Sequence, residues 1–122
     1  MPTITAYHSI RDYNFILGPN DSQTLTFNPA NDIRQDGDID RPLLCCRVDP
    51  SSDARNLELS VQINGRDNIN VTLGGTVSRS FMEIVPHQDV NKGNNNITFE
   101  VANKGTGTLS ISDVIMWYKR SI

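Results

Sequence analysis

The fold is decided by residues 93–118, which read GNNNITFEVANKGTGTLSISDVIMWY. Apolar side chains occupy alternate positions in both halves of this stretch, at Ile97, Phe99, Val101, Leu109, Ile111, Ile115 and Trp117. A period of two is typical of β-strands that bury one face and expose the other. The glycine-rich residues 103–107 interrupt the pattern. We therefore predict two long strands that pair as a hairpin across a tight turn at this interruption.

The rest of the chain carries further strand patterns between turn signals. The clearest covers residues 56–64 and ends in Asn64-Gly65, a dipeptide typical of hairpin turns. Other strands are expected at residues 3–7, 13–17, 23–27, 42–48, 68–73 and 79–85. No segment has sustained helical periodicity, although residues 86–92 are expected to form a short helical turn. We predict an all-β fold over residues 1–122: a single-domain antiparallel β-sandwich (jelly roll) of about eight or nine strands, with no substantial helix.

Composition narrows the classes of partner. The 122 residues carry a formal net charge of -3, with 20% charged and 7% aromatic residues. Without a cluster of Lys and Arg the chain lacks the electrostatic signature of nucleic-acid binding, so we expect no nucleic-acid partner. No apolar run approaches the roughly 20 residues of a membrane span, and we expect no membrane partner. The first residues lack a basic start followed by an apolar block, so a signal peptide is not expected.

Two adjacent cysteines, Cys45 and Cys46, lie in the most apolar segment, residues 42–48. In a strand they point to opposite faces, so we expect two free thiols, one buried and one half-buried, rather than a disulfide. Free thiols favour a reducing compartment such as the cytoplasm, and the localisation is otherwise unknown. The near-continuous apolarity predicts a strand covered on both faces, and hence a candidate interface of a homo-oligomer.

The C-terminal stretch also carries a resemblance. Its pattern is a Gly-Asn loop at residues 93–96, an Ile-x-Phe strand at 97–99, a glycine turn at 105–107 and an apolar strand that contains Asp113. This pattern resembles galactose-binding-like β-sandwiches, a group that includes carbohydrate-binding modules and some lectins, and it covers about the last quarter of the chain. The resemblance implies a non-catalytic sugar-binding module. It also implies a structural calcium with one ligand from an aspartate near the last strand, the position of Asp113.

Asp113 also stands out by its place in the alternation. It shares the parity of Leu109 and Ile111, so a regular strand would point it into the core, where a bare carboxylate is costly. Three alternatives remain open. A β-bulge at this point turns the side chain outward and moves the buried face to Val114 and Met116. Otherwise backbone N–H groups or an arginine hold the carboxylate, or it binds a metal ion.

Two further sets of polar residues are candidate sites. Carboxylates alternate at Asp36, Asp38 and Asp40 within the polar segment 28–41. Oxygen ligands with this spacing suit calcium, although a solvated acidic loop has the same pattern. The second set combines loop amides with an arginine and a histidine that flank the same edge, and we predict it as the ligand-binding site: Arg66, His87, Asn91, Asn94 and Asn95. Amides bond sugar hydroxyls well because each offers donors and an acceptor, but amides also fill turns.

No motif in the sequence indicates catalysis. The two histidines, His8 and His87, are far apart in the sequence, and no nucleophile elbow or phosphate-binding loop occurs. We therefore predict a protein that is not an enzyme: a lectin-like carbohydrate-binding module with a glycan partner and calcium as a candidate cofactor. The alternative is a structural or assembly protein whose jelly roll self-associates or docks on a larger partner. The few aromatic residues favour this alternative, and the asparagine-rich loop favours sugar binding.

Overall fold

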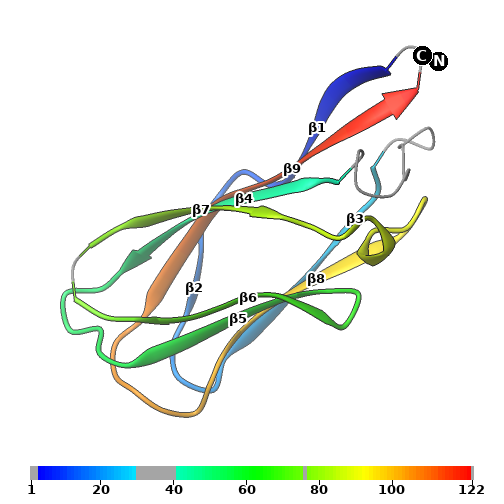
Figure 1. Cartoon of the computed structure of the whole chain (residues 1–122). Helices are drawn as coiled ribbons and strands as arrows, with labels where there is room; N and C mark the ends of the chain where they lie inside the picture. The colour runs from blue at the N-terminus through cyan, green and yellow to red at the C-terminus, as the bar shows by residue number, and fades with distance from the viewer. Residues whose placement is uncertain (1–2, 30–40, 76, 122) are drawn as a thin grey trace.

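The computed structural model describes residues 3–29, 41–75 and 77–121. Within them the chain forms nine strands and one 3₁₀ turn (Figure 1): β1 (Thr3–Arg11), β2 (Phe15–Leu17), β3 (Ser22–Phe27), β4 (Leu43–Pro50), β5 (Leu57–Ile63), β6 (Arg66–Leu73), β7 (Arg79–Ile84), η1 (His87–Asp89), β8 (Asn95–Val101) and β9 (Leu109–Ser121). The strands and the short turn therefore lie close to their predicted positions. Among the described residues there is no helix long and apolar enough to cross a membrane.

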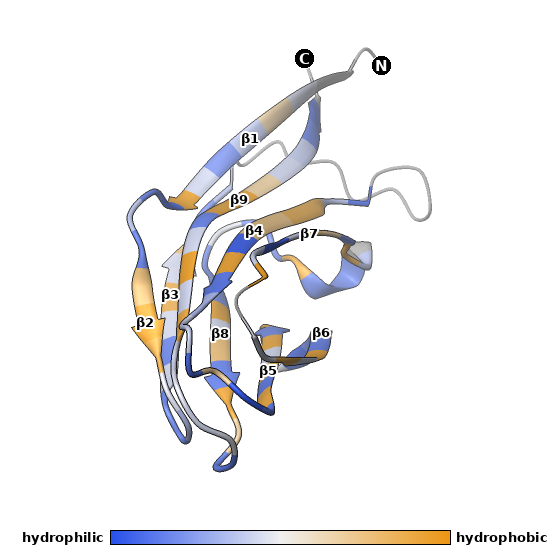
Figure 2. Cartoon of the chain, turned by 90° about the vertical axis from the view of Figure 1, so that its left-hand side faces the viewer, coloured by the Kyte–Doolittle hydropathy of each residue, from blue (hydrophilic) through white to orange (hydrophobic). Residues whose placement is uncertain are grey.

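The strands form two antiparallel sheets that stack face to face (Figure 1 and Figure 2). Sheet A has the strand order β1-β9-β4-β7, and β2 pairs with the first residues of β9. Sheet B has the strand order β3-β8-β5-β6. The prediction of an all-β antiparallel sandwich is confirmed.

The hydrophobic core lies between the two sheets. Figure 2 shows apolar and polar residues alternating along the strands, as the period of two requires. The core side chains with the least exposure come from both sheets: Leu44, Val48, Leu57, Leu59, Val61, Ile63, Ile97, Phe99, Leu109, Ile111 and Met116. Phe15 of β2 packs edge to face on Phe99 of β8, with ring centroids 5.3 Å apart. Full burial of each such side chain stabilises the fold by about 1.5–3 kcal/mol relative to exposure.

The predicted hairpin within residues 93–118 is wrong. β8 belongs to sheet B and β9 to sheet A, so the two strands do not pair. The connection crosses between the sheets because it lies against the β4–β5 loop, where Arg55 and Thr106 exchange two backbone hydrogen bonds of 3.0 Å. Gly105 and Gly107 have φ values of +86° and +84°, and a Cβ atom on either would lie within 2.6 Å of atoms of residues 54–55. The two glycines therefore permit a close crossing and not a hairpin turn.

A β-bulge changes the direction of the side chains along β9. The register against β4 shifts between Cys45 and Arg47, where β9 has one extra residue. Asp113 has a φ of +54° and is exposed. Beyond the bulge the buried side chains are Val114, Met116 and Tyr118. Of the three alternatives for Asp113, the structure shows the outward-turning bulge, and whether the carboxylate binds a metal stays a prediction.

Candidate functional site

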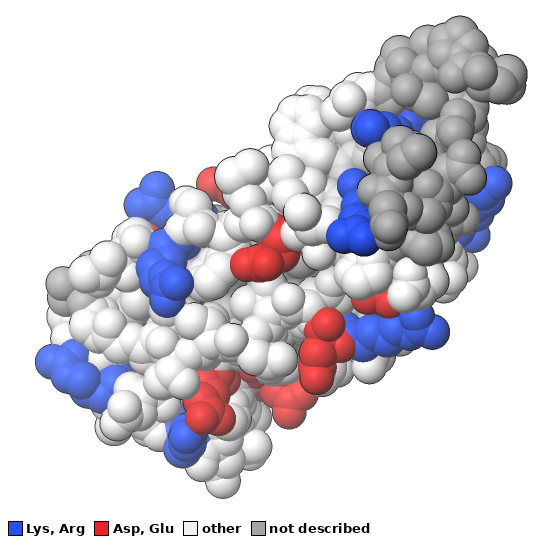
Figure 3. Space-filling view, viewed as in Figure 1, with Lys and Arg blue, Asp and Glu red and all other residues white. Residues whose placement is uncertain are grey.

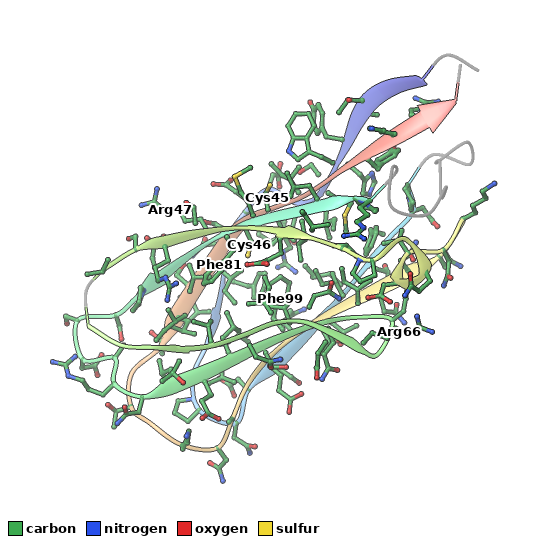
Figure 4. The ribbon with its side chains drawn as sticks, viewed as in Figure 1. Cys45, Cys46, Arg47, Arg66, Phe81 and Phe99 are labelled. Carbon is green, nitrogen blue, oxygen red and sulfur yellow. The ribbon has the colours of Figure 1, made fainter. Side chains whose placement is uncertain are left out.

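Arg66 lies on β6, at one edge of sheet B, and next to it lies the segment that contains the 3₁₀ turn η1. The Arg66 guanidinium lies 3.0 Å from the carboxylate of Asp89, which is 5% exposed. The amide of Asn64 donates a hydrogen bond to the Asp89 carbonyl at 2.7 Å. Arg66 therefore lies beside the 3₁₀ turn that begins at His87 (Figure 4), and whether these two residues bind a ligand stays a prediction.

Asn95 is buried beneath the neighbouring loop, where its side chain is 1% exposed. Its amide holds the loop through hydrogen bonds. Its Oδ1 accepts hydrogen bonds from the Asn91 backbone N–H at 2.7 Å and from Asn64 Nδ2 at 2.8 Å. Its Nδ2 donates to the carbonyls of Asn91 at 2.9 Å and Gly93 at 3.0 Å. All four hydrogen-bonding positions of the amide are thus used within the protein, which makes Asn95 part of the loop framework. Asn91 and Asn94 are exposed on this loop and are available to a ligand.

The predicted metal ligands are not seen together. Asp113 lies on β9 of sheet A, and the segment with Asp36, Asp38 and Asp40 lies outside the described residues. Within the part of the chain that the structure describes, no group of three or more His, Cys, Asp or Glu side chains is arranged to hold a metal ion. The calcium site stays a prediction.

A polar groove lies on the outer face of sheet B. It has a volume of about 520 Å³. Its polar lining comes from outward side chains of three adjacent strands: Glu58, Ser60 and Gln62 of β5, Asp67, Asn70 and Thr72 of β6, and Glu100 of β8. The register places these side chains in rows, because Ser60 pairs with both Asn70 and Glu100. The groove therefore presents carboxylate, amide and hydroxyl groups side by side.

The groove is acidic, and its side chains offer hydrogen-bond donors and acceptors. Of its three carboxylates, Glu58 has an ion pair among the described residues, with Lys104 Nζ at 2.5 Å. Both partners are about half exposed, so this pair adds little to stability. Carboxylates accept hydrogen bonds from hydroxyl groups, while amides both donate and accept. None of the described residues that line the groove is aromatic, so a ligand here gains nothing from ring stacking.

Sequence reasoning missed this groove. Its polar residues are the outward half of the alternation in residues 58–72 and in β8, and a polar outward face is ordinary for an antiparallel sheet with one side in solvent. The available signal was the concentration of acids and amides among those outward positions. That signal identifies no groove until the register of β5, β6 and β8 is known.

The outer face of sheet A has the opposite character. Two rows of side chains cross its strands in register, Tyr7-Trp117-Leu43-Ile84 and Ser9-Ile115-Cys45-Met82. We call the seven residues other than Ser9 the apolar face. Four of its members are exposed, Tyr7 (62%), Trp117 (39%), Met82 (67%) and Ile84 (62%). In Figure 3, which views the sandwich from the edge where β7 and β6 lie, uncharged atoms lie in the upper part of the view near β9 and β4, with acidic and basic side chains beside them.

The two cysteines are free and point to opposite faces of β4 (Figure 4). Cys45 is half-buried in the apolar face, and Cys46 is buried in the core, as predicted. Burial raises the pKa of the Cys46 thiol to about 12 and raises the pKa of Cys45 as well. Because the thiolate is the reactive form, neither residue has the environment of a catalytic nucleophile.

Comparison with known proteins supports the fold. No protein-family model matches the chain, and no curated protein matches it. The structure of dimeric latent PorU from Porphyromonas gingivalis matches with a TM-score of 0.67 and 12% identity, over 98% of this chain and 13% of that one. A β-porphyranase of glycoside hydrolase family 86, from the human gut bacterium Bacteroides plebeius, matches with a TM-score of 0.66 and 17% identity, over 98% and 21%.

A similar structure of comparable length is the CBM36-1 domain of a multidomain xylanase from the hindgut metagenome of Trinervitermes trinervoides. It matches with a TM-score of 0.51 and 13% identity, over 94% of this chain and 96% of that one. The chain therefore shares its β-sandwich fold with this carbohydrate-binding module, which is consistent with the resemblance of the C-terminal stretch. It spans about one-eighth of PorU and one-fifth of the porphyranase. Identities this low establish the fold alone.

Proposed function

We propose that the chain is a non-catalytic glycan-binding module whose ligand lies in the groove on sheet B. The observation that carries this proposal is the set of amide, hydroxyl and carboxylate side chains that line the groove in rows. Each sugar hydroxyl is both a donor and an acceptor, so it pairs with groups of these kinds. The similarity to the CBM36-1 domain over nearly the full length of both chains supports the same function.

The dimensions of the groove support a short ligand segment. Three adjacent strands line the groove, and their spacing makes it roughly 10 Å wide across the strands. Each hydrogen bond contributes only about 0.5–1.5 kcal/mol net, because the same groups bind water in the free protein. We therefore expect weak binding of a short oligosaccharide segment, with affinity that depends on several side chains together.

A glycan array followed by isothermal titration calorimetry tests this function. We expect selective binding to one sugar class, and we expect Gln62→Ala and Asn70→Ala each to weaken it by about tenfold, the effect of one lost hydrogen bond with a desolvated partner. Asn94→Ala is the matched control, since it removes an exposed amide from the loop at the edge of the same sheet.

The outcomes separate the two candidate locations. Loss of binding in Asn70→Ala but not in Asn94→Ala supports the groove. The reverse result moves the ligand to the loop of Asn91 and Asn94, as the sequence predicts. An array with no binding, from protein shown to be folded, contradicts the glycan-binding function.

One observation favours a second candidate function, self-assembly. The apolar face is continuous across four strands, and it reaches both edge strands of sheet A, with Tyr7 on β1 and Met82 and Ile84 on β7. Exposed apolar areas of this kind typically mark protein interfaces. We propose a second copy of this chain as the occupant, because an uncharged sheet face packs on its own twofold copy without burying charge.

Sedimentation measurements test self-assembly with a matched pair of substitutions. Ile84 is 62% exposed on the apolar face, and Ile16 is 61% exposed on β2. We expect the wild-type chain and Ile16→Lys to sediment as dimers and Ile84→Lys to sediment as a monomer, because a lysine at the interface would be desolvated. A wild-type chain that stays monomeric at every concentration contradicts this candidate function.

A further inference from the structure

A second cavity lies at the open side of the sandwich, between the edge strands of the two sheets. It has a volume of about 540 Å³ and is lined by residues 9–13, which end β1 and begin the following turn, and by residues 23–26 of β3. The register of β1 against β9 shifts between Ser9 and Arg11, and such bulges re-aim side chains. None of the residues that line this cavity lines the groove on sheet B, so the two are separate.

Arg11 is the cationic residue of this cavity. Its guanidinium carbon lies 4.1 Å from the centroid of the Tyr13 ring and 5.4 Å from that of Phe15. Among the described residues, its buried Nε has no hydrogen-bond partner and its guanidinium has no ion pair with a carboxylate. The positive charge of Arg11 is therefore not neutralised by any described carboxylate, and an anionic group in the cavity would supply that neutralisation.

We propose that this cavity binds the anionic group of an acidic sugar, a carboxylate or a sulfate, and this proposal rests on the proposed glycan-binding function. A guanidinium pairs with an oxyanion through two parallel N–H···O bonds, and the flanking rings of Tyr13 and Phe15 hold it in place for that pairing. The ring of Tyr13 is 62% exposed and offers a surface for the sugar ring.

The rest of the lining favours a sugar acid over a simple anion. Asp12 also lines the cavity, and its carboxylate repels a free anion but accepts hydrogen bonds from sugar hydroxyls. Gln23 and Thr26 line the β3 side with an amide and a hydroxyl group. A ligand with one anionic group and several hydroxyls therefore matches both the Arg11 side and the rest of the cavity.

Calorimetry with two matched ligand pairs tests the proposal. The pairs are tetragalacturonate with its methyl ester, and a sulfated galactan oligosaccharide with its desulfated form. We expect the charged member of at least one pair to bind about tenfold or more tightly than its neutral counterpart. Arg11→Gln should abolish the preference, and Arg11→Lys should keep part of it, because lysine retains the charge but not the planar fork.

Two further variants make the test specific, and a melting curve of each checks that it is folded. Tyr13→Ala changes an exposed residue and should weaken both members of a pair equally, since ring contact does not depend on the anion. Asn70→Ala, in the groove, should leave the preference for the charged member unchanged. Raising the salt concentration should reduce that preference in the wild-type chain.

Each outcome supports or overturns the proposal. A preference within one pair that Arg11→Gln removes supports it and identifies the anion as carboxylate or sulfate. Equal binding of charged and neutral sugars, or a preference that survives Arg11→Gln, overturns it while glycan binding stands. Absence of any sugar binding overturns both this proposal and the proposed function.

Discussion

At the scale of single residues, Cys46 couples stability to alkaline pH. Burial raises the pKa of its thiol from an ordinary 9.0 to about 12, so between these values the folded chain retains a proton that the unfolded chain loses. The folded state then binds more protons, and its stability falls as the pH rises. We expect this group to lower the free energy of unfolding by up to about 1.4 kcal/mol per pH unit in that window.

Urea unfolding at several pH values measures this slope. Cys46→Ala should show a shallower loss of stability above the ordinary thiol pKa than the wild-type chain shows. Cys45→Ala is the control, because Cys45 is only half-buried and burial raises its pKa less. Equal slopes for the wild-type chain and Cys46→Ala would show that the core does not hold the thiol in its protonated form.

Asn95 gives a second prediction at this scale. Its amide makes four hydrogen bonds while 1% exposed, so Asn95→Ala leaves the N–H of Asn91 and two carbonyls without their partner. We expect the free energy of unfolding to fall by about 2–4 kcal/mol, since each buried unsatisfied group costs about 1–3 kcal/mol. Asn94→Ala removes the neighbouring exposed amide and should change stability by less than about 0.5 kcal/mol. Similar denaturation midpoints for both variants would contradict the framework role of Asn95.

At the scale of elements, the crossing from β8 to β9 depends on close contact between backbones. A Cβ atom on Gly105 would lie 2.5 Å from the Arg55 carbonyl oxygen, whereas one on Gly65 would meet nothing within 4 Å. Both glycines have positive φ, so alanine at either costs about 1–2 kcal/mol of backbone strain. We expect Gly105→Ala to lower the free energy of unfolding by at least about 2 kcal/mol more than Gly65→Ala does. Only at position 105 must the neighbouring backbone move to make room for the new methyl group. Equal melting temperatures for the two variants would mean that the crossing loop can move away at no cost.

These two strands also show how far the sequence predicts the fold. The alternation in β8 and β9 is a local property, so it identifies each strand and its buried side. The partner of a strand depends on contacts between distant residues, here Thr106 with Arg55, and no local pattern contains them. Gly105 and Gly107 therefore look like turn residues in the sequence, but in the structure they allow the connection from β8 to β9 to pass close to the β4–β5 loop. Asp113 is the opposite case, because an acid on an apolar face indicates an irregularity there, and the bulge that the structure shows is one of the three alternatives that this pattern leaves open.

The candidate site is harder to predict for the same reason. Asn94 and Asn95 are adjacent and identical, yet one is exposed and the other is used within the protein. The groove residues Gln62 and Asn70 lie on different strands and have ordinary outward positions until the register brings them together. Residue type and spacing therefore identify the chemistry available, while burial and register decide which groups meet a ligand.

At the scale of the whole molecule, the outer faces of the two sheets differ in chemistry. The apolar face lies on sheet A and the polar groove on sheet B, on opposite sides of the sandwich. A dimer through the apolar face would therefore leave both grooves open. Because each groove is expected to bind weakly, two grooves in one particle would raise the affinity for a polymeric glycan through effective concentration. Self-assembly and glycan binding are thus compatible in one protein.

Calcium binding is tested on the whole molecule, because a metal ion that binds only the folded chain stabilises the entire fold. The predicted ligands are the carboxylates of Asp36, Asp38 and Asp40, or that of Asp113. We expect EDTA to lower the melting temperature and added calcium to restore it.

Asp113→Asn removes the charge but keeps a residue that tolerates the positive φ of +54°, so it changes the metal response without disturbing the bulge. If Asp113→Asn abolishes the response, the site is on β9. If only the triple substitution to asparagine at 36, 38 and 40 abolishes it, the site is the acidic segment. Identical melting curves with EDTA and with calcium would remove the metal from the mechanism of binding.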